Sequence, residues 1–123
     1  MKIFIEIKKI IQFIRDVFEN FKPNDFKGDG YLYGLNQAGH FAFSVFLVFV
    51  FNLNPIVVCL GWFLWESIQV LNSKDYEDFT KDLVFEIGGA ILLSIHSVLF
   101  QKIYLSVYFI LLFVLSVLKE NEE

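Results

Sequence analysis

Cysteine, basic residues and nucleophile motifs are scarce in this chain, and each scarcity excludes a class of protein. A single cysteine, Cys59, prevents an internal disulfide and leaves no cysteine pair for a zinc site. Lys and Arg number 10 against 14 Asp and Glu, so the formal net charge is −4. Because nucleic acids bind basic surfaces, we expect no nucleic-acid partner. The sequence contains no Gly-x-Ser-x-Gly nucleophile motif and no phosphate-binding loop.

Apolar residues are abundant instead, and they are gathered into runs. Of the 123 residues, 56% are hydrophobic and 19% aromatic, including 16 Phe. Ordinary soluble domains have about 45–50% apolar residues. We therefore predict a single all-α domain, an integral membrane helical bundle with the lipid bilayer as its partner.

Four short membrane spans follow from the apolar runs. They are predicted at residues 37–53, 55–71, 82–100 and 103–118. Pro23 and three glycines predict a loop over residues 22–36, and charged residues predict another over 72–81. A hairpin is predicted at Gln101 and Lys102, and residues 119–123 are predicted to be a polar tail.

Residues 1–21 predict an amphipathic helix. Its apolar stripe is spaced 4-3-4-3-4 and consists of Ile3, Ile7, Ile10, Ile14, Val17 and Phe21. Because charges run through the whole segment, it predicts a helix lying in the membrane interface rather than a span. Packing against the protein's own helices or a sister subunit, in a homo-oligomer, is the alternative.

Basic residues are distributed unevenly around the predicted spans. Nine of the ten lie before the first span, between the second and third, or after the fourth, and only Lys102 lies on the other side. The positive-inside rule then places both termini in the cytoplasm. We expect a multi-pass protein of the inner or cytoplasmic membrane.

Five polar residues interrupt the predicted spans, and ionisable groups inside a membrane are usually functional. They are His40, Glu66, Gln69, Asp82 and Glu86. Glu66 and Gln69 share one helical face, as do Asp82 and Glu86. Because these pairs end the second span and begin the third, and His40 begins the first, we predict a single cluster at the cytoplasmic membrane face. His96 lies about 15 Å beyond Glu86 along a helix, so it is predicted to be outside the cluster.

Three kinds of role fit such a cluster. Carboxylates and an imidazole are ligands for Mg²⁺, Mn²⁺ or Zn²⁺, which makes His40, Glu66, Asp82 and Glu86 candidate metal ligands. In an enzyme, Glu66 or Glu86 is the candidate general base, His40 the candidate acid or ligand, and Gln69 a substrate-binding residue. Alternatively, the cluster only bridges helices, or it conducts ions or protons.

The order of these residues resembles the VanZ-like family of small membrane proteins. The similarity covers about residues 39–90: His40-Phe41 opens a span, Glu66-x-x-Gln69 ends the next, and Asp82 begins a motif ending at Gly89. In this chain Glu86 stands where the family has Asn. Asn36 and Gln37 stand where an Asp-Lys pair commonly precedes the His.

The resemblance implies a protein of the cell envelope, in a family associated with teicoplanin resistance. We therefore expect the polar site to bind a lipid or polar headgroup, with a divalent metal. Two other functions remain open: a small membrane assembly protein, which a phage could encode, and a channel or holin-like pore.

Overall fold

The structure is all-helical over the part of the chain that it describes. The computed structural model describes residues 1–20, 26–73 and 76–122. The elements in those ranges are α1 (Lys2–Asn20), α2 (Gly30–Val50), α3 (Pro55–Ser73), α4 (Tyr76–Ile91), the 3₁₀-helix η1 (Leu92–Ser94) and α5 (Val98–Glu120). The predicted all-α class is confirmed.

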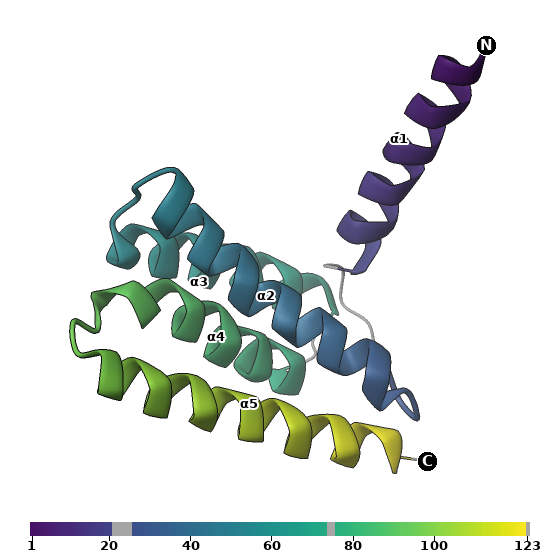
Figure 1. Ribbon diagram of the computed structural model, residues 1–123. Coiled ribbons are helices and arrows are strands. Elements are labelled where there is room, and N and C mark those ends of the chain that lie inside the picture. The colour runs from purple at the N-terminus through teal and green to yellow at the C-terminus, as the bar shows by residue number, and fades with distance from the viewer. Residues whose placement is uncertain (21–25, 74–75, 123) are drawn as a thin grey trace.

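Helices α2 to α5 form a bundle in which successive helices alternate in direction (Figure 1). Helix α2 packs against α4 and α5, and α4 also packs against α3. The start of α2 and the end of α5 meet at one end of the bundle, which we call the proximal end. The turn between α2 and α3 and the connection from η1 to α5 form the distal end.

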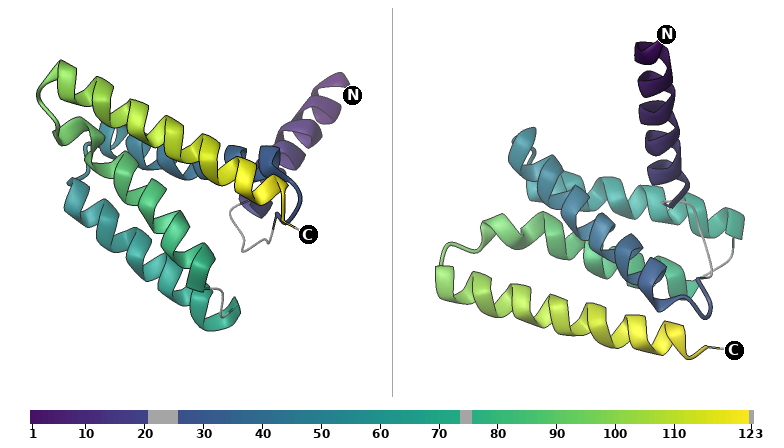
Figure 2. Two further views of the ribbon diagram at one scale, coloured as in Figure 1. Left: turned by 90° about the horizontal axis from the view of Figure 1, so that it is seen from below. Right: turned by 45° about the vertical axis from the view of Figure 1, so that its right-hand side comes forward.

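Helix α1 projects from the bundle and runs across the direction of the other helices (Figure 2). Its range agrees with the predicted N-terminal helix, and the apolar residues Ile3, Ile7, Ile10 and Ile14 are all exposed. The side chains of the other two predicted stripe members, Val17 and Phe21, are not among those that the structure describes. Residues 22–25 of the predicted loop also lie outside the described residues.

Helix α2 begins at Gly30, so the predicted loop is wrong for residues 30–36. Asp29 caps the helix by accepting a hydrogen bond from Leu32 N at 3.1 Å. The glycines that suggested a loop are contact surfaces instead. A Cβ atom on Gly30 would lie 2.1 Å from the carbonyl oxygen of Ser116, and one on Gly34 would lie 2.7 Å from Ser116 Oγ. Small residues here let α2 and α5 approach closely.

Helix α4 also begins earlier than predicted, at Tyr76, so most of the predicted loop over 72–81 is helical. Glu77 and Asp78 lie in its first turn, where the helix dipole favours acidic residues. Asp82 is therefore a residue of the second turn, and its predicted position at a helix start is wrong.

The turn before the last helix lies upstream of the predicted hairpin at Gln101 and Lys102. Helix α4 ends at Ile91, and α5 begins at Val98 with Ser97 as its N-cap. Gln101 lies in the first turn of α5 and donates from Nε2 to the carbonyl oxygen of Ile95 at 2.6 Å. Helix α5 continues to Glu120, so the first two residues of the predicted polar tail, 119 and 120, are helical.

Three helices in the described residues are long and apolar enough to cross a membrane: Gly30–Val50, Pro55–Asn72 and Val98–Glu120. Helix α4 has 16 residues, five of them charged, and does not meet this criterion. Four spans are therefore not confirmed, although α4 runs beside the other three.

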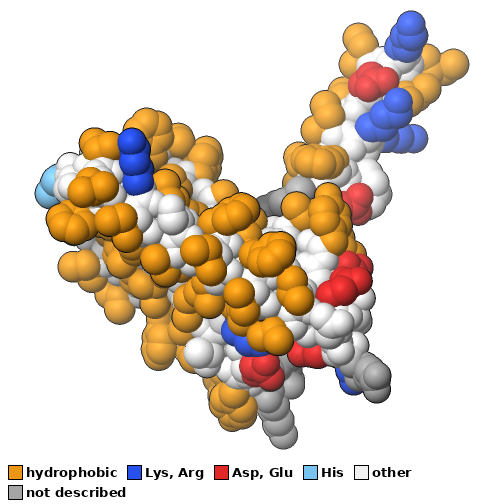
Figure 3. Space-filling view, turned by 60° about the horizontal axis from the view of Figure 1, so that its bottom comes forward, with side chains coloured by type: hydrophobic (Ala, Val, Ile, Leu, Met, Phe, Trp, Pro, Cys, Tyr) orange, Lys and Arg blue, Asp and Glu red, His pale blue; other side chains and the backbone are white. Residues whose placement is uncertain are grey.

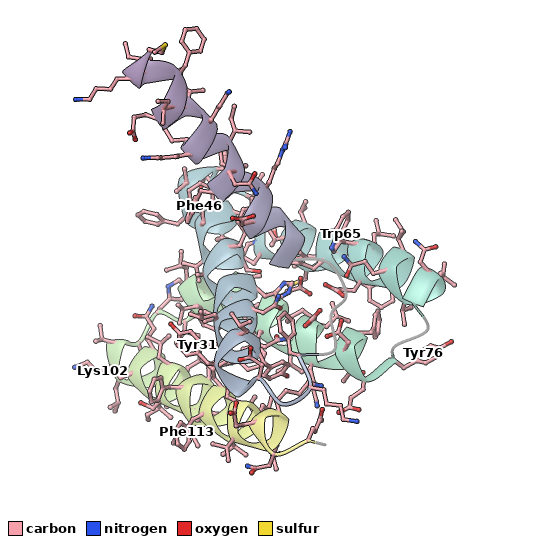
Figure 4. The ribbon with its side chains drawn as sticks, turned by 90° about the vertical axis from the view of Figure 1, so that its right-hand side faces the viewer. Tyr31, Phe46, Trp65, Tyr76, Lys102 and Phe113 are labelled. Carbon is pink, nitrogen blue, oxygen red and sulfur yellow. The ribbon has the colours of Figure 1, made fainter. Side chains whose placement is uncertain are left out.

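The outer surface of the bundle is largely apolar, and charged side chains concentrate towards its ends (Figure 3). Three aromatic side chains on the outside of their helices illustrate this surface (Figure 4). They are Phe46, which is 45% exposed, Trp65, which is 48% exposed, and Phe113, which is 65% exposed. A continuous apolar exterior is uncommon on water-soluble proteins. It is compatible with a multi-pass membrane protein.

Candidate functional site

Helix α2 presents a row of buried polar side chains to the rest of the bundle. Gln37, His40 and Ser44 are spaced 3-4 along one face, with Tyr33 one turn before them. Each is at most 2% exposed. Because α2 begins at Gly30, His40 lies at its middle, about 15 Å from either end. It does not lie near the start of the helix, where the sequence had placed it.

Helix α4 faces this row with Asp82, Glu86 and Gly89. A Cβ atom on Gly89 would lie 2.1 Å from the carbonyl oxygen of Phe41 and 2.9 Å from Ser44 Cβ. Only glycine fits such a close approach. The contact brings Glu86, one turn away on α4, to within hydrogen-bond reach of His40 on α2.

Helix α3 completes the cluster with Trp62 and Glu66, again one turn apart. The ring of Trp62 meets His40 edge-to-face, with centroids 5.8 Å apart. Glu66 is 1% exposed. Gln69 lies one turn beyond Glu66 and is half-buried.

Three polar contacts join these side chains. Nδ1 of His40 lies 2.9 Å from Oε2 of Glu86. Nε2 of His40 lies 3.8 Å from Oδ2 of Asp82. Nε2 of Gln37 donates to Oδ1 of Asp82 at 2.6 Å. Helices α2 and α4 are therefore linked by two successive polar layers, one turn apart.

Three of the residues form a possible metal-binding group. One ligand atom from each of His40, Glu66 and Glu86 lies within 4.8 Å of the other two, and all three side chains are buried. Asp82 is not in this group, although the sequence had suggested it as a ligand.

Several buried polar atoms of the cluster have no hydrogen-bond partner among the residues that the structure describes. They are Gln37 Oε1, Ser44 Oγ, Trp62 Nε1, Glu66 Oε1 and Glu86 Oε1. A buried polar atom without a partner destabilises a fold by about 1–3 kcal/mol. Unpartnered carboxylate oxygens on Glu66 and Glu86 therefore favour a ligand that accepts their lone pairs.

Two lysines at the proximal end pair with carboxylates outside the cluster. Lys81 pairs with Glu77, and Lys119 pairs with Glu122 at 3.3 Å. The hydrogen bond from Lys81 lowers the pKa of the exposed Glu77 carboxyl. Neither of these ion pairs includes a carboxylate of the buried cluster.

The bundle interior changes character beyond the cluster, towards the distal end. There Val48, Val58 and Ala90 form an apolar core with Trp62 of the cluster, and Leu47 and Cys59 pack against it. Leu83, next to Asp82, also contacts this core. The buried polar row of α2 thus stops at Ser44. His96, predicted to be outside the cluster, is exposed in the distal connection.

The sequence located most of the cluster but missed two of its members. His40, Glu66, Asp82 and Glu86 come together as helical phase predicted, while their catalytic and metal-binding roles stay predictions. The sequence pattern places neither Gln37 nor Trp62 against His40. The spacing of Gln37 three residues before His40 was a usable signal.

Comparisons with protein-family models, with curated proteins and with solved structures give no match for this chain. The resemblance to VanZ-like proteins therefore stays a prediction from the sequence.

Proposed function

We propose that this chain is an integral membrane protein that binds a divalent transition-metal cation inside its helical bundle. His40, Glu66 and Glu86 are the proposed ligands. The observation that carries the proposal is that their ligand atoms lie within 4.8 Å of one another in a buried position.

The spacing of the three groups suits a single ion. Nitrogen and oxygen ligands bind Zn²⁺ at about 2.0–2.2 Å, so two ligands of one ion lie roughly 3–4 Å apart. Small side-chain rotations bring the group into that range. One imidazole with carboxylates favours Zn²⁺ or Mn²⁺ over Ca²⁺, which takes oxygen ligands alone.

Charge supports a cation as well. Glu66, Asp82 and Glu86 are each at most 4% exposed. Burying ionised carboxylates is unfavourable unless positive charge accompanies them. One imidazolium balances only one of the three, whereas a divalent cation brings two positive charges to the same place.

We further propose that α2 to α5 all cross the membrane and that both termini lie in the cytoplasm. Lys27, Lys81 and Lys119 belong to the proximal end and Lys102 to the distal end, which fits the positive-inside rule. Helix α1 runs across the bundle direction (Figure 2). It would then lie along the cytoplasmic membrane surface with its isoleucines in the lipid.

The resemblance to VanZ-like proteins supports a role at the cell envelope. In that role a metal held by the three ligands would supply Lewis-acid polarisation of a polar or lipid headgroup, and Gln69 would contact the headgroup. The oxygen of Glu66 or Glu86 that does not bind the metal would be the general base. The cation would reach the cluster from the proximal end, where Gln37 and Asp82 add a polar layer beside the ligands. The apolar core of the distal half favours a binding site over a pore.

A structural role is the second candidate. The His40–Glu86 contact at 2.9 Å joins α2 to α4, and such a link stabilises a membrane bundle without any metal. The two roles differ in one property, because only the first requires the protein to hold a metal ion.

Metal content separates these roles. The detergent-purified protein is incubated with Zn²⁺ or Mn²⁺, dialysed, and analysed by inductively coupled plasma mass spectrometry. We expect one ion per chain in the wild type and in His96→Ala, and loss of that ion in His40→Ala and Glu66→Gln. A wild type that retains no metal, or a His40→Ala variant that retains as much as the wild type, would overturn the proposal.

A further inference from the structure

The two ring nitrogens of His40 face different carboxyl groups. Nδ1 lies 2.9 Å from Oε2 of Glu86, and Nε2 lies 3.8 Å from Oδ2 of Asp82. We propose that Asp82 is a positioning residue: held by Gln37, it keeps a proton on Nε2 of His40 and leaves Nδ1 to bind the cation. This inference rests on the metal site proposed above.

The Nδ1 side of the ring faces Glu86, one of the proposed ligands. The 2.9 Å between Nδ1 and Oε2 of Glu86 matches the spacing of two adjacent ligands on one ion, which is about 3 Å for bonds of about 2.1 Å at a right angle. Glu86 and Glu66 belong to one mutually close group of possible ligand atoms with His40, whereas Asp82 does not. Because Nδ1 is the ring nitrogen beside Glu86, an ion bound by Oε2 of Glu86 would meet Nδ1.

The Nε2 side has the features of a supporting contact. A metal-bound histidine almost always donates its other ring N–H to a carboxylate, a carbonyl or water, and this contact fixes the tautomer. At 3.8 Å the Asp82 contact is too long for a hydrogen bond. When Nδ1 binds the cation, the ring proton is on Nε2, and a buried carboxylate 3.8 Å away stabilises that proton.

Gln37 determines which way Asp82 points. Its side-chain amide donates to Oδ1 of Asp82 at 2.6 Å, so the other oxygen, Oδ2, is the one directed at His40. Both side chains are buried, at 1% and 4% exposure. Gln37 precedes His40 by three residues on α2, and Asp82 precedes Glu86 by four on α4. The supporting layer thus lies one turn closer to the proximal end than the metal ligands.

Nitrogen NMR of the histidine ring tests the inference directly. The probe is ¹¹³Cd²⁺ bound to protein labelled with ¹⁵N-histidine, in a His96→Gln background that leaves His40 as the single histidine. We expect a cadmium–nitrogen coupling to Nδ1 and a proton on Nε2. A coupling to Nε2 would overturn the positioning role.

Cadmium affinity gives a second readout. Asp82→Asn and Gln37→Met preserve side-chain size while weakening the supporting layer, and each should reduce Cd²⁺ affinity by about 10–100-fold. The matched control is Glu77→Gln, an exposed carboxylate one helical turn before Lys81, which should leave the affinity unchanged. Asp82→Asn with wild-type affinity and an unchanged Nδ1 coupling would contradict the inference.

Failure of this inference can be told from failure of the metal site. A wild-type protein that binds no Cd²⁺ contradicts the metal site itself, and the positioning role with it. If the wild type binds one Cd²⁺ through Nε2, or if Asp82→Asn leaves the Cd²⁺ affinity unchanged, the metal site stands. Only the role given to Asp82 is then excluded.

Discussion

Gly89 of α4 packs directly against the backbone carbonyl of Phe41 in α2: a Cβ atom at Gly89 would lie 2.1 Å from that oxygen. This contact determines how close the two helices come. It also sets the distance between His40 and Glu86, because His40 is next to Phe41 in α2 and Glu86 lies one turn from Gly89 in α4. The polar cluster therefore depends on a glycine that carries no polar side chain.

Substitution of Gly89 by alanine should destabilise the bundle by roughly 1–3 kcal/mol, because the added methyl group has no space and the helices must separate. Gly61→Ala is the matched control, since a Cβ atom at Gly61 meets nothing within 4 Å. Thermal unfolding in detergent, followed by circular dichroism, measures both. Equal melting temperatures for the two variants would contradict the close packing of α2 on α4.

Glu120 stabilises the start of α2 from the other end of the chain. Its Oε2 accepts a hydrogen bond from the backbone N–H of Gly30 at 2.6 Å. Glu120→Ala should lower the free energy of unfolding by about 1 kcal/mol, the usual effect of losing a helix N-terminal acceptor. Glu6→Ala on the exposed helix α1 should have a smaller effect in the same unfolding measurement.

Tyr104 and Tyr108 connect α5 to α4 through backbone carbonyls. The Tyr104 hydroxyl donates to Gly88 O at 2.6 Å, and the Tyr108 hydroxyl donates to Val84 O at 3.0 Å. Tyr104→Phe should destabilise the protein by about 1 kcal/mol, because it removes one hydrogen bond between helices. Tyr31→Phe, at an exposed position on α2, should be neutral.

The Glu77–Lys81 pair makes the start of α4 sensitive to acid. The hydrogen bond from Lys81 lowers the pKa of Glu77, so this carboxylate adds stability above its unfolded pKa and loses it as the pH falls through the folded pKa. In an NMR titration, Glu77 should show a lower midpoint in the wild type than in Lys81→Met. Identical midpoints would mean that the pair does not persist in solution.

The sequence predicted the helical class and most of the cluster because both follow from periodicity. Residues at helical spacing, such as Asp82 and Glu86, keep their common face wherever the helix begins. For the same reason, predicting the start of α2 at residue 37 instead of Gly30 did not separate His40 from its partners. It did shift the expected depth of His40, from the beginning of a helix to its middle.

The errors arose where long-range contacts override local signals. Gly30 and Gly34 have the composition of a loop, but both lie in a helix where the close approach of Ser116 of α5 leaves no space for a larger residue. The turn at residues 95–97 has no glycine or proline, but Ser97 supplies an N-cap for α5. The contact between Gln37 and Asp82 joins residues 45 positions apart, so local pattern did not reveal it.

X-ray absorption spectroscopy of the zinc-loaded protein tests the central claim most directly, because it reports the ligands of the ion itself. Bound by His40, Glu66 and Glu86, the zinc should show a shell of nitrogen and oxygen at about 2.0–2.2 Å with outer scattering from one imidazole. Sulfur scattering at about 2.3 Å, which would indicate Cys59, would contradict this assignment. So would a zinc ion with no imidazole ligand.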